Sequence, residues 1–200
     1  MLETFDREFL SNDVKLIAGC DEAGRGPLAG PVVVGACIMP LNEELIIEGV
    51  NDSKKLTEKK REMLFEKIVK TAICYKIEEV DNIVIDNINI LNATKLGMVK
   101  AINGLSTKPN LVLVDAVKNL DIDYNQMGII KGDAKSYNIA CASILAKVYR
   151  DRLMKELDKK YPVYQFAKHK GYGTKLHISL LKQHGKCEIH RNTFIKHFVD

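Results

Sequence analysis

Short apolar runs alternate along the chain with longer amphipathic segments. Runs rich in Val, Ile and Leu occur at 14–20, 32–38, 72–79, 111–115 and 127–133. Their length and β-branched composition predict strands. Because several runs are apolar at nearly every position, we expect strands buried on both faces, as in a partly parallel sheet.

Helical spacing of apolar residues predicts four longer elements: a helix after Thr57, and helices over 91–105, 134–159 and about 174–183. Thr57 is a favourable N-cap residue, and Met63, Leu64 and Ile68 share the expected inner face of the first helix. The first half of the 134–159 segment, SYNIACASILAKV, is apolar on most sides. We therefore expect it to pack against the sheet.

The order of these elements predicts an α/β fold with a mixed sheet flanked by helices. The length of 200 residues and the 46% hydrophobic content suit one domain over 1–200, with a core at about 14–160 and a helical region at about 161–200. No exposed apolar stripe indicates a subunit interface, so we expect a monomer.

Five scattered cysteines and no C-x-x-C pair argue against a disulfide framework or a zinc site. The acidic N-terminal segment does not resemble a signal peptide, and the longest nearly apolar stretch, 27–40, is shorter than the roughly 20 residues of a membrane helix. These features predict a cytoplasmic protein with reduced thiols and no membrane span.

Positive charge is concentrated at the C-terminal end. Residues 131–200 contain 15 Lys and Arg against 6 Asp and Glu, whereas the whole chain carries a net charge of +4. A basic surface of this kind favours a polyanionic partner, because it gains free energy by releasing phosphate counterions. A solvated helical surface explains the charge equally well.

Four acidic residues follow apolar strand runs: Asp21, Glu22, Asp115 and Asp133. Strand ends on one side of an α/β sheet commonly form binding sites, so we expect these carboxylates to converge. Their mutual repulsion requires cations, and oxygen ligands favour Mg²⁺ or Mn²⁺. Two such ions support phosphodiester hydrolysis. For each acid alone, a loop or capping role is the simpler interpretation; Asp133 could cap the following helix.

Adjacent residues of a regular strand point to opposite faces, so Asp21 and Glu22 should not both reach one site from a strand. We therefore predict that the chain bends there, aided by Gly24 and Gly26.

Three further features suit nucleic-acid recognition. Gly24 and Gly26 would let the backbone approach a sugar 2′-hydroxyl closely, although a tight turn is the alternative. The polar loop 52–55, with Ser53 and Lys54, could contact phosphate or simply be solvated. Tyr172, between two glycines in a basic segment, could stack on a sugar or base or serve only in packing.

Six runs in the chain resemble ribonuclease HII motifs and occur in the order of that family: GCDEAGRGPLAGPVVVGA, NDSKKLTEKKREML, LVDA, GDAKSYNIACASILAKVYRD, HKGYGT and HRNTF. The DEAGRGP and ASILAKV runs are the most distinctive. Together the runs extend over nearly the whole chain. Departures are small: Ala116 stands where the family usually has glycine, and GKCEIHRNTF replaces a more proline-rich approach to the HR pair.

The resemblance implies a ribonuclease H-like fold, with a mixed five-stranded sheet and a small helical C-terminal region. It implies that Asp21, Glu22, Asp115 and Asp133 are the catalytic metal ligands. It also implies substrate contacts by Gly24, Arg25, Gly26, Ser53, Lys54 and Tyr172. The expected reaction is two-metal hydrolysis of the RNA strand of RNA–DNA hybrids and incision 5′ to ribonucleotides in duplex DNA, leaving 3′-hydroxyl and 5′-phosphate ends.

Two alternatives remain at this stage. A non-catalytic nucleic-acid-binding domain would explain the basic charge, but it would gain nothing from acids near phosphate. A related metal-dependent DNA nuclease would keep the acids, but it would have no use for a turn that reads a 2′-hydroxyl.

Overall fold

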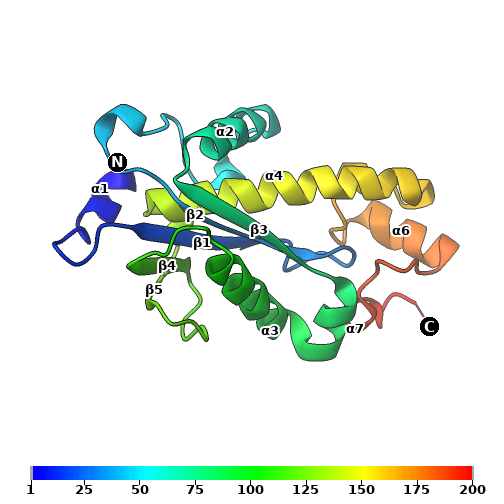
Figure 1. Cartoon of the computed structure of the whole chain (residues 1–200). Helices are drawn as coiled ribbons and strands as arrows, with labels where there is room; N and C mark the ends of the chain where they lie inside the picture. Colours follow the sequence, from blue (N-terminus) through cyan, green and yellow to red (C-terminus); the bar gives the residue numbers. More distant parts are fainter. Residues whose placement is uncertain (1, 200) are drawn as a thin grey trace.

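The computed structural model describes residues 2–199, and its centre is a five-stranded sheet in the order β3-β2-β1-β4-β5 (Figure 1). The strands are β1 (Ile17–Ala23), β2 (Val32–Ile38), β3 (Cys74–Val80), β4 (Leu111–Asp115) and β5 (Asn125–Ile129). β2 pairs antiparallel with β1 and β3, whereas β4 pairs parallel with β1 and β5. The predicted mixed five-stranded sheet and α/β class are confirmed.

Helices cover both faces of the sheet. The α-helices are α1 (Leu2–Arg7), α2 (Glu58–Thr71), α3 (Asn82–Asn103), α4 (Tyr137–Lys160), α5 (Phe166–His169), α6 (Lys175–His184) and α7 (Asn192–Ile195). Short 3-10 helices are η1 (Glu43–Leu45), η2 (Ser53–Lys55), η3 (Gly132–Ala134) and η4 (Pro162–Tyr164). In Figure 1, α2 and α4 lie on one side of the sheet, α3 lies on the other, and α6 and α7 lie beyond one end. Across residues 2–199, no helix has the length and apolar character needed to cross a bilayer.

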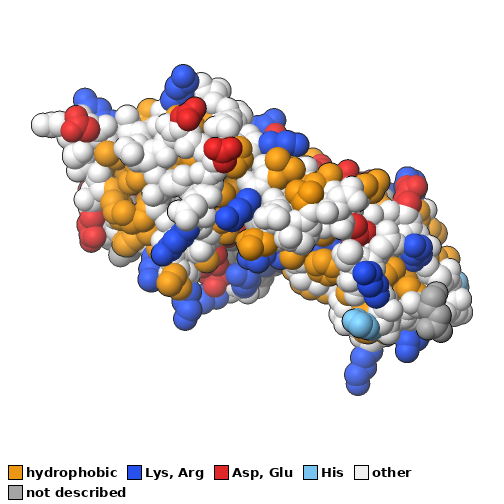
Figure 2. Space-filling view, turned by 90° about the horizontal axis from the view of Figure 1, so that it is seen from below, with side chains coloured by type: hydrophobic (Ala, Val, Ile, Leu, Met, Phe, Trp, Pro, Cys, Tyr) orange, Lys and Arg blue, Asp and Glu red, His pale blue; other side chains and the backbone are white. Residues whose placement is uncertain are grey.

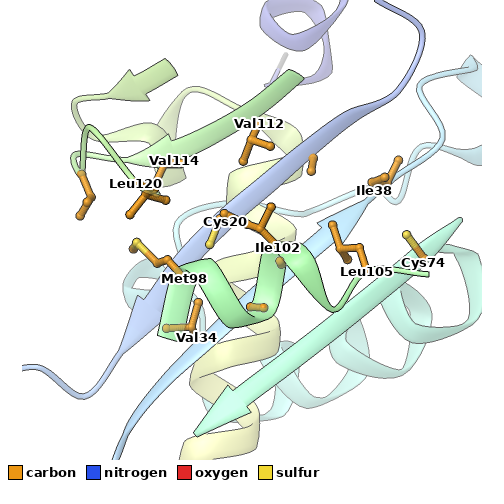
Figure 3. Packing of buried hydrophobic residues seen from close by; sticks show 14 residues of the cluster. Cys20, Val34, Ile38, Cys74, Met98, Ile102, Leu105, Val112, Val114 and Leu120 are labelled. Atoms are coloured by element: carbon orange, nitrogen blue, oxygen red, sulfur yellow. The ribbon is translucent and has the colours of Figure 1, made fainter. Parts of the chain in front are cut away.

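Two hydrophobic clusters sandwich the sheet. Met98 and Ile102 of α3 pack against Cys20 and Val34 on one face (Figure 3), and α2 and α4 cover the opposite face. Four of the five cysteines, all except Cys187, are buried and act as small core residues. The core therefore fixes the strands from both sides and leaves their ends to form a site.

Glycines on β1 and β2 allow α4 to approach the sheet closely. A Cβ on Gly19 would lie 2.1 Å from the Asn138 carbonyl carbon, and one on Gly35 would lie 2.5 Å from the Ala142 carbonyl oxygen. Such distances are far below van der Waals contact, so any side chain there would displace α4. This close packing places one face of α4 directly beside β1.

One predicted helix start and one predicted core residue are wrong. The helix predicted over 91–105 begins at Asn82, capped by Asp81, and has a non-helical residue, Asn89, with φ 65°. Its first turns, rich in Ile, Val and Asn, have a composition that favours strands and turns, so sequence pattern misses them. Met63 is also 48% exposed, and Phe65 takes its place on the buried face of α2. The Thr57 cap is confirmed, because its side chain accepts a hydrogen bond from the Lys60 amide.

Candidate metal and substrate site

Asp21 and Glu22 lie inside β1, so the bend predicted at this point is wrong. They pair with Gly35 and Val34 of β2, which keeps β1 in register as far as Ala23. Pairing with β4 ends at Cys20. The two acids therefore stand where β1 runs past the carboxyl end of its parallel neighbour, an edge at which α/β proteins form sites.

Asp115 ends β4 as predicted, and its Oδ1 accepts a hydrogen bond of 2.6 Å from the Gly132 amide. The prediction for Asp133 is wrong in detail: β5 ends at Ile129, and Asp133 lies in η3, after a left-handed turn at Lys131. Asp133 does not cap α4 either, because Ser136 does so. The Gly132 hydrogen bond nevertheless ties the turn that carries Asp133 to the end of β4.

Ala116 directly follows Asp115 and adopts φ 52°, in the left-handed region. Glycine reaches this conformation without strain, whereas a Cβ costs about 1–2 kcal/mol. The departure from the family pattern at this residue is thus accommodated by local backbone strain, while the Ala116 amide still donates to the Ile129 carbonyl at 2.9 Å.

Three of the four acids, Asp21, Glu22 and Asp133, lie in an environment that disfavours their ionised form. Burial, and next the charges of Glu22 and Asp115, raise the pKa of Asp21 well above its usual value. Burial also raises the pKa of Glu22, although Arg25 opposes this effect. For Asp133, burial and then the charges of Asp52 and Asp115 raise the pKa, against the opposing effect of Lys54. Neighbouring negative charges thus reinforce burial at three of the acids, which is the condition that a bound cation relieves.

The donor chemistry of this cluster fits a hard divalent cation. Every candidate ligand atom is a carboxylate oxygen, and the buried Glu22 Oε2 has no hydrogen-bond partner. The ammonium group of Lys54 lies 3.5 Å from Asp133 Oδ2 and supplies positive charge there. Across residues 2–199, however, no three or more His, Cys, Asp or Glu side chains are gathered closely enough to hold a metal ion. The acids are therefore neighbours whose side chains would have to draw closer around an ion.

A pocket of about 260 Å³ opens beside Glu22 and collects the predicted substrate residues. Its lining comprises Glu22, Ala23, Gly24, Arg25, Gly26, Ser53, Lys54, Ser143, Lys147 and Tyr172. The glycine-rich turn, the 52–55 loop and the Tyr172 loop, which lie far apart in sequence, thus meet at one place. Asp21, Asp115 and Asp133 do not line this pocket.

The 52–55 loop is an ordered part of the site. Ser53 is buried, and its Oγ lies 2.8 Å from the Oγ of Ser143 on α4. Ser143 also hydrogen-bonds the Asp21 carboxylate, which lowers the pKa of Asp21 against the stronger effect of burial. Arg61 of α2 donates to the Ser53 carbonyl at 3.0 Å. Lys54 remains exposed and available to a ligand, so the loop is anchored at Ser53 and open at Lys54.

Tyr172 is 41% exposed at the edge of the pocket, which excludes a purely internal packing role. The guanidinium of Arg150 lies 5.8 Å from the centre of its ring. An exposed aromatic face at this position can stack on a sugar or base.

Sequence reasoning missed Ser143, Lys147, Arg150 and Arg191. Ser143 and Lys147 are one turn apart in a largely apolar segment of α4. Two polar side chains on the same face of an apolar helix could have indicated that this face borders a site. Arg150 and Arg191 are fully buried, and the only sign of this in the sequence is that they lie in the GDAKSYNIACASILAKVYRD and HRNTF runs. Figure 2 shows Lys and Arg side chains scattered along the whole face in view, with Asp and Glu side chains among them.

Comparisons with known proteins agree with this architecture. The Ribonuclease HII family model matches residues 18–197. Ribonuclease HII of Caldicellulosiruptor bescii is 56% identical over 194 residues, covering 97% of this chain and 93% of that protein. Ribonuclease HII of Acetivibrio thermocellus is 54% identical over 195 residues, covering 98% of this chain and 75% of that protein.

Solved structures give the same result. Ribonuclease H2 from Pyrococcus horikoshii OT3 has a TM-score of 0.75 and 32% identity, over 90% of this chain and 93% of that chain. The structure of the PCNA:RNase HII complex from Archaeoglobus fulgidus has a TM-score of 0.77 and 27% identity, over 90% of this chain and 94% of that chain. With a family model spanning most of its length and relatives more than half identical, this chain belongs to the ribonuclease HII family of metal-dependent endoribonucleases.

Proposed function

We propose that the protein hydrolyses the RNA strand of RNA–DNA hybrids and incises duplex DNA on the 5′ side of an embedded ribonucleotide, by two-metal-ion catalysis. The observation that carries this proposal is the pocket beside Glu22. It joins a backbone turn suited to a 2′-hydroxyl, a lysine suited to phosphate and an exposed tyrosine suited to a sugar. The three further acids, Asp21 in β1, Asp115 at the end of β4 and Asp133 in η3, do not line the pocket.

The proposed division of roles follows from position. Asp21, Glu22, Asp115 and Asp133 would hold Mg²⁺ or Mn²⁺, and such ions, when bound, activate water and stabilise the leaving oxygen. Gly24, Arg25 and Gly26 would contact the ribose, and Tyr172 the adjoining deoxyribose. Ser53 and Lys54 would bind the backbone phosphate. Hydrolysis by this route leaves a 3′-hydroxyl and a 5′-phosphate and requires no covalent enzyme intermediate.

The decisive experiment compares two labelled duplexes that differ by one oxygen atom, one carrying a single ribonucleotide and the other all DNA. With Mg²⁺ or Mn²⁺, we expect one cut 5′ to the ribonucleotide and none in the all-DNA duplex. The upstream product should be extended by a polymerase, since it ends in a 3′-hydroxyl. Mapping the cut and both ends on a sequencing gel measures this outcome.

Matched variants separate the candidate functions. Asp21→Asn and Asp115→Asn should lose most activity, whereas Asp123→Asn, which alters an exposed acid outside the site, should keep it. Equal cutting of both duplexes would favour a DNA nuclease. Binding of both without cutting would favour a non-catalytic nucleic-acid-binding domain, and full activity of Asp21→Asn would contradict the metal-ligand assignment.

A further inference from the structure

Two arginine side chains, both fully buried, lie beneath the glycine-rich turn. Arg150 of α4 and Arg191, which precedes α7, have no exposed surface, and burial lowers the pKa of Arg191 to about 9 and that of Arg150 to about 10. Among the described residues, neither forms an ion pair with Asp or Glu. Burying an unpaired guanidinium is costly, so its hydrogen bonds must be numerous and well placed.

All three side-chain hydrogen bonds of Arg191 go to carbonyl oxygens of the segment that contains the turn. Nη2 donates to Gly24 at 2.6 Å, Nη1 to Arg25 at 2.8 Å, and Nε to Gly30 at 2.9 Å. Arg150 instead donates to the carbonyls of Ala29 and Pro31, which follow the turn, and to that of Lys170, near Tyr172. Arg191 is thus the arginine that determines the orientation of the peptide planes at residues 24–26.

That orientation has a direct consequence for the pocket. In a planar trans peptide, the carbonyl and the next amide N–H point in opposite directions. Because the Gly24 and Arg25 carbonyls face Arg191, the amides of Arg25 and Gly26 point away from it. In the described part of the chain, neither amide has a hydrogen-bond acceptor. Both remain available to an oxygen atom of a ligand.

We infer that Arg191 is a positioning residue for ribonucleotide recognition, holding the Arg25 and Gly26 amides so that they meet the ribose. This inference rests on the proposed function. It assigns a role to the C-terminal segment, which reaches the turn from more than 160 residues away in sequence. The alternative is that Arg191 only stabilises the fold, in which case all substrates would be affected alike.

The test uses Arg191→Lys, which keeps the charge but replaces the planar fork with one compact ammonium group. Two quantities are measured: kcat/KM for the duplex with one ribonucleotide, and the inhibition constant of the matched all-DNA duplex, which reports backbone contacts alone. We expect kcat/KM to fall about tenfold or more, the effect of losing one good hydrogen bond in recognition. The inhibition constant should change less than about twofold.

Two further variants keep the result interpretable. Ile102→Ala, on the buried face of α3, supplies a destabilised control that should leave both quantities unchanged in the folded protein. If Arg191→Lys does not fold, Asp86→Ala replaces it. Asp86 accepts hydrogen bonds from the Asn192 and Thr193 amides, so its loss should loosen the segment that holds Arg191. A smaller but equally selective fall in kcat/KM is then expected.

The possible outcomes are distinct. A selective fall in kcat/KM supports the positioning role. Wild-type kcat/KM in Arg191→Lys, or a parallel change in both quantities, overturns it and leaves the proposed function intact. If Asp86→Ala has to be used instead, an unchanged kcat/KM, or a parallel change in kcat/KM and the inhibition constant, also overturns the positioning role. Failure of the unmodified protein to cut the ribonucleotide duplex overturns the proposed function, and this inference with it.

Discussion

Replacing Asp21 with asparagine is expected to stabilise the metal-free protein at neutral pH. Asp21 is only 4% exposed, and burial together with Glu22 and Asp115 opposes its ionised form. Asparagine has the same shape and can still accept the hydrogen bond that Asp21 Oδ1 accepts from the Glu22 amide at 2.7 Å. The substitution therefore removes the charge and keeps the local geometry.

The magnitude follows from the cost of an uncompensated buried charge, about 3–5 kcal/mol. The hydrogen bonds of Asp21 to the Glu22 amide and to Ser143 already offset part of that cost, so we expect a gain of about 2 kcal/mol. For a chain of this length, the gain corresponds to a rise of about 4–8 °C in Tm. Divalent ion at a hundred times its Kd should add about 2.7 kcal/mol to the unmodified protein, and less to the variant.

The pH dependence has a defined sign. Because the pKa of Asp21 is raised in the folded state, the folded protein binds this proton more tightly than the unfolded chain does. The advantage of the variant should therefore be full above the folded pKa, shrink as the pH falls, and vanish below the unfolded value near 3.8. Groups that titrate alike in both proteins cancel in the difference between their free energies of unfolding.

Thermal unfolding in EDTA across this pH range, followed by circular dichroism, measures the effect. Asp123→Asn is the control, because that acid is exposed and its neutralisation should leave Tm nearly unchanged. If Asp21→Asn were less stable than the unmodified protein in EDTA at pH 7, the view of the acid cluster as an uncompensated charge would be refuted.

Three other predictions concern the pocket and the C-terminal region. Gly26→Ala should fold normally but cut poorly, because its Cβ would meet only Tyr172, at 4.0 Å. Gly24→Ala should instead lose about 3 kcal/mol of stability, because its Cβ would lie 2.0 Å from Arg150 Nε and its φ is +95°. Urea unfolding and activity assays together separate these two effects. Tyr172→Ala should lower kcat/KM by about 5- to 150-fold through lost stacking, whereas Tyr172→Phe should keep most activity. An equal loss of kcat/KM in the two variants would show that the hydroxyl group, and not the ring, makes the contact. Burial lowers the pKa of both His177 and His190 to about 4. The stability that the two neutral histidines contribute should therefore be complete above pH 6.5 and decline as the pH falls toward 4. A urea midpoint that stays constant over that range would contradict this prediction.

Local patterns in the sequence determined most of the framework. Apolar runs located all five strands, and β4 was predicted residue for residue at 111–115. The Thr57 and Thr174 caps define the starts of α2 and α6. These features depend on neighbouring residues and on burial of apolar surface, which composition and spacing express directly. Candidate acids could also be chosen, since carboxylates after apolar runs are unusual.

Tertiary structure alone decided how those residues meet. β1 continues through Asp21 and Glu22 because pairing with β2 holds it extended, which no pattern within β1 reveals. Arg191 would be expected on the surface, because an isolated guanidinium is costly to bury. Its burial depends on carbonyl oxygens more than 160 residues earlier that converge on it only after folding. Local sequence encodes the elements and the reactive groups, whereas long-range packing decides which polar groups can be buried and what they hold in place.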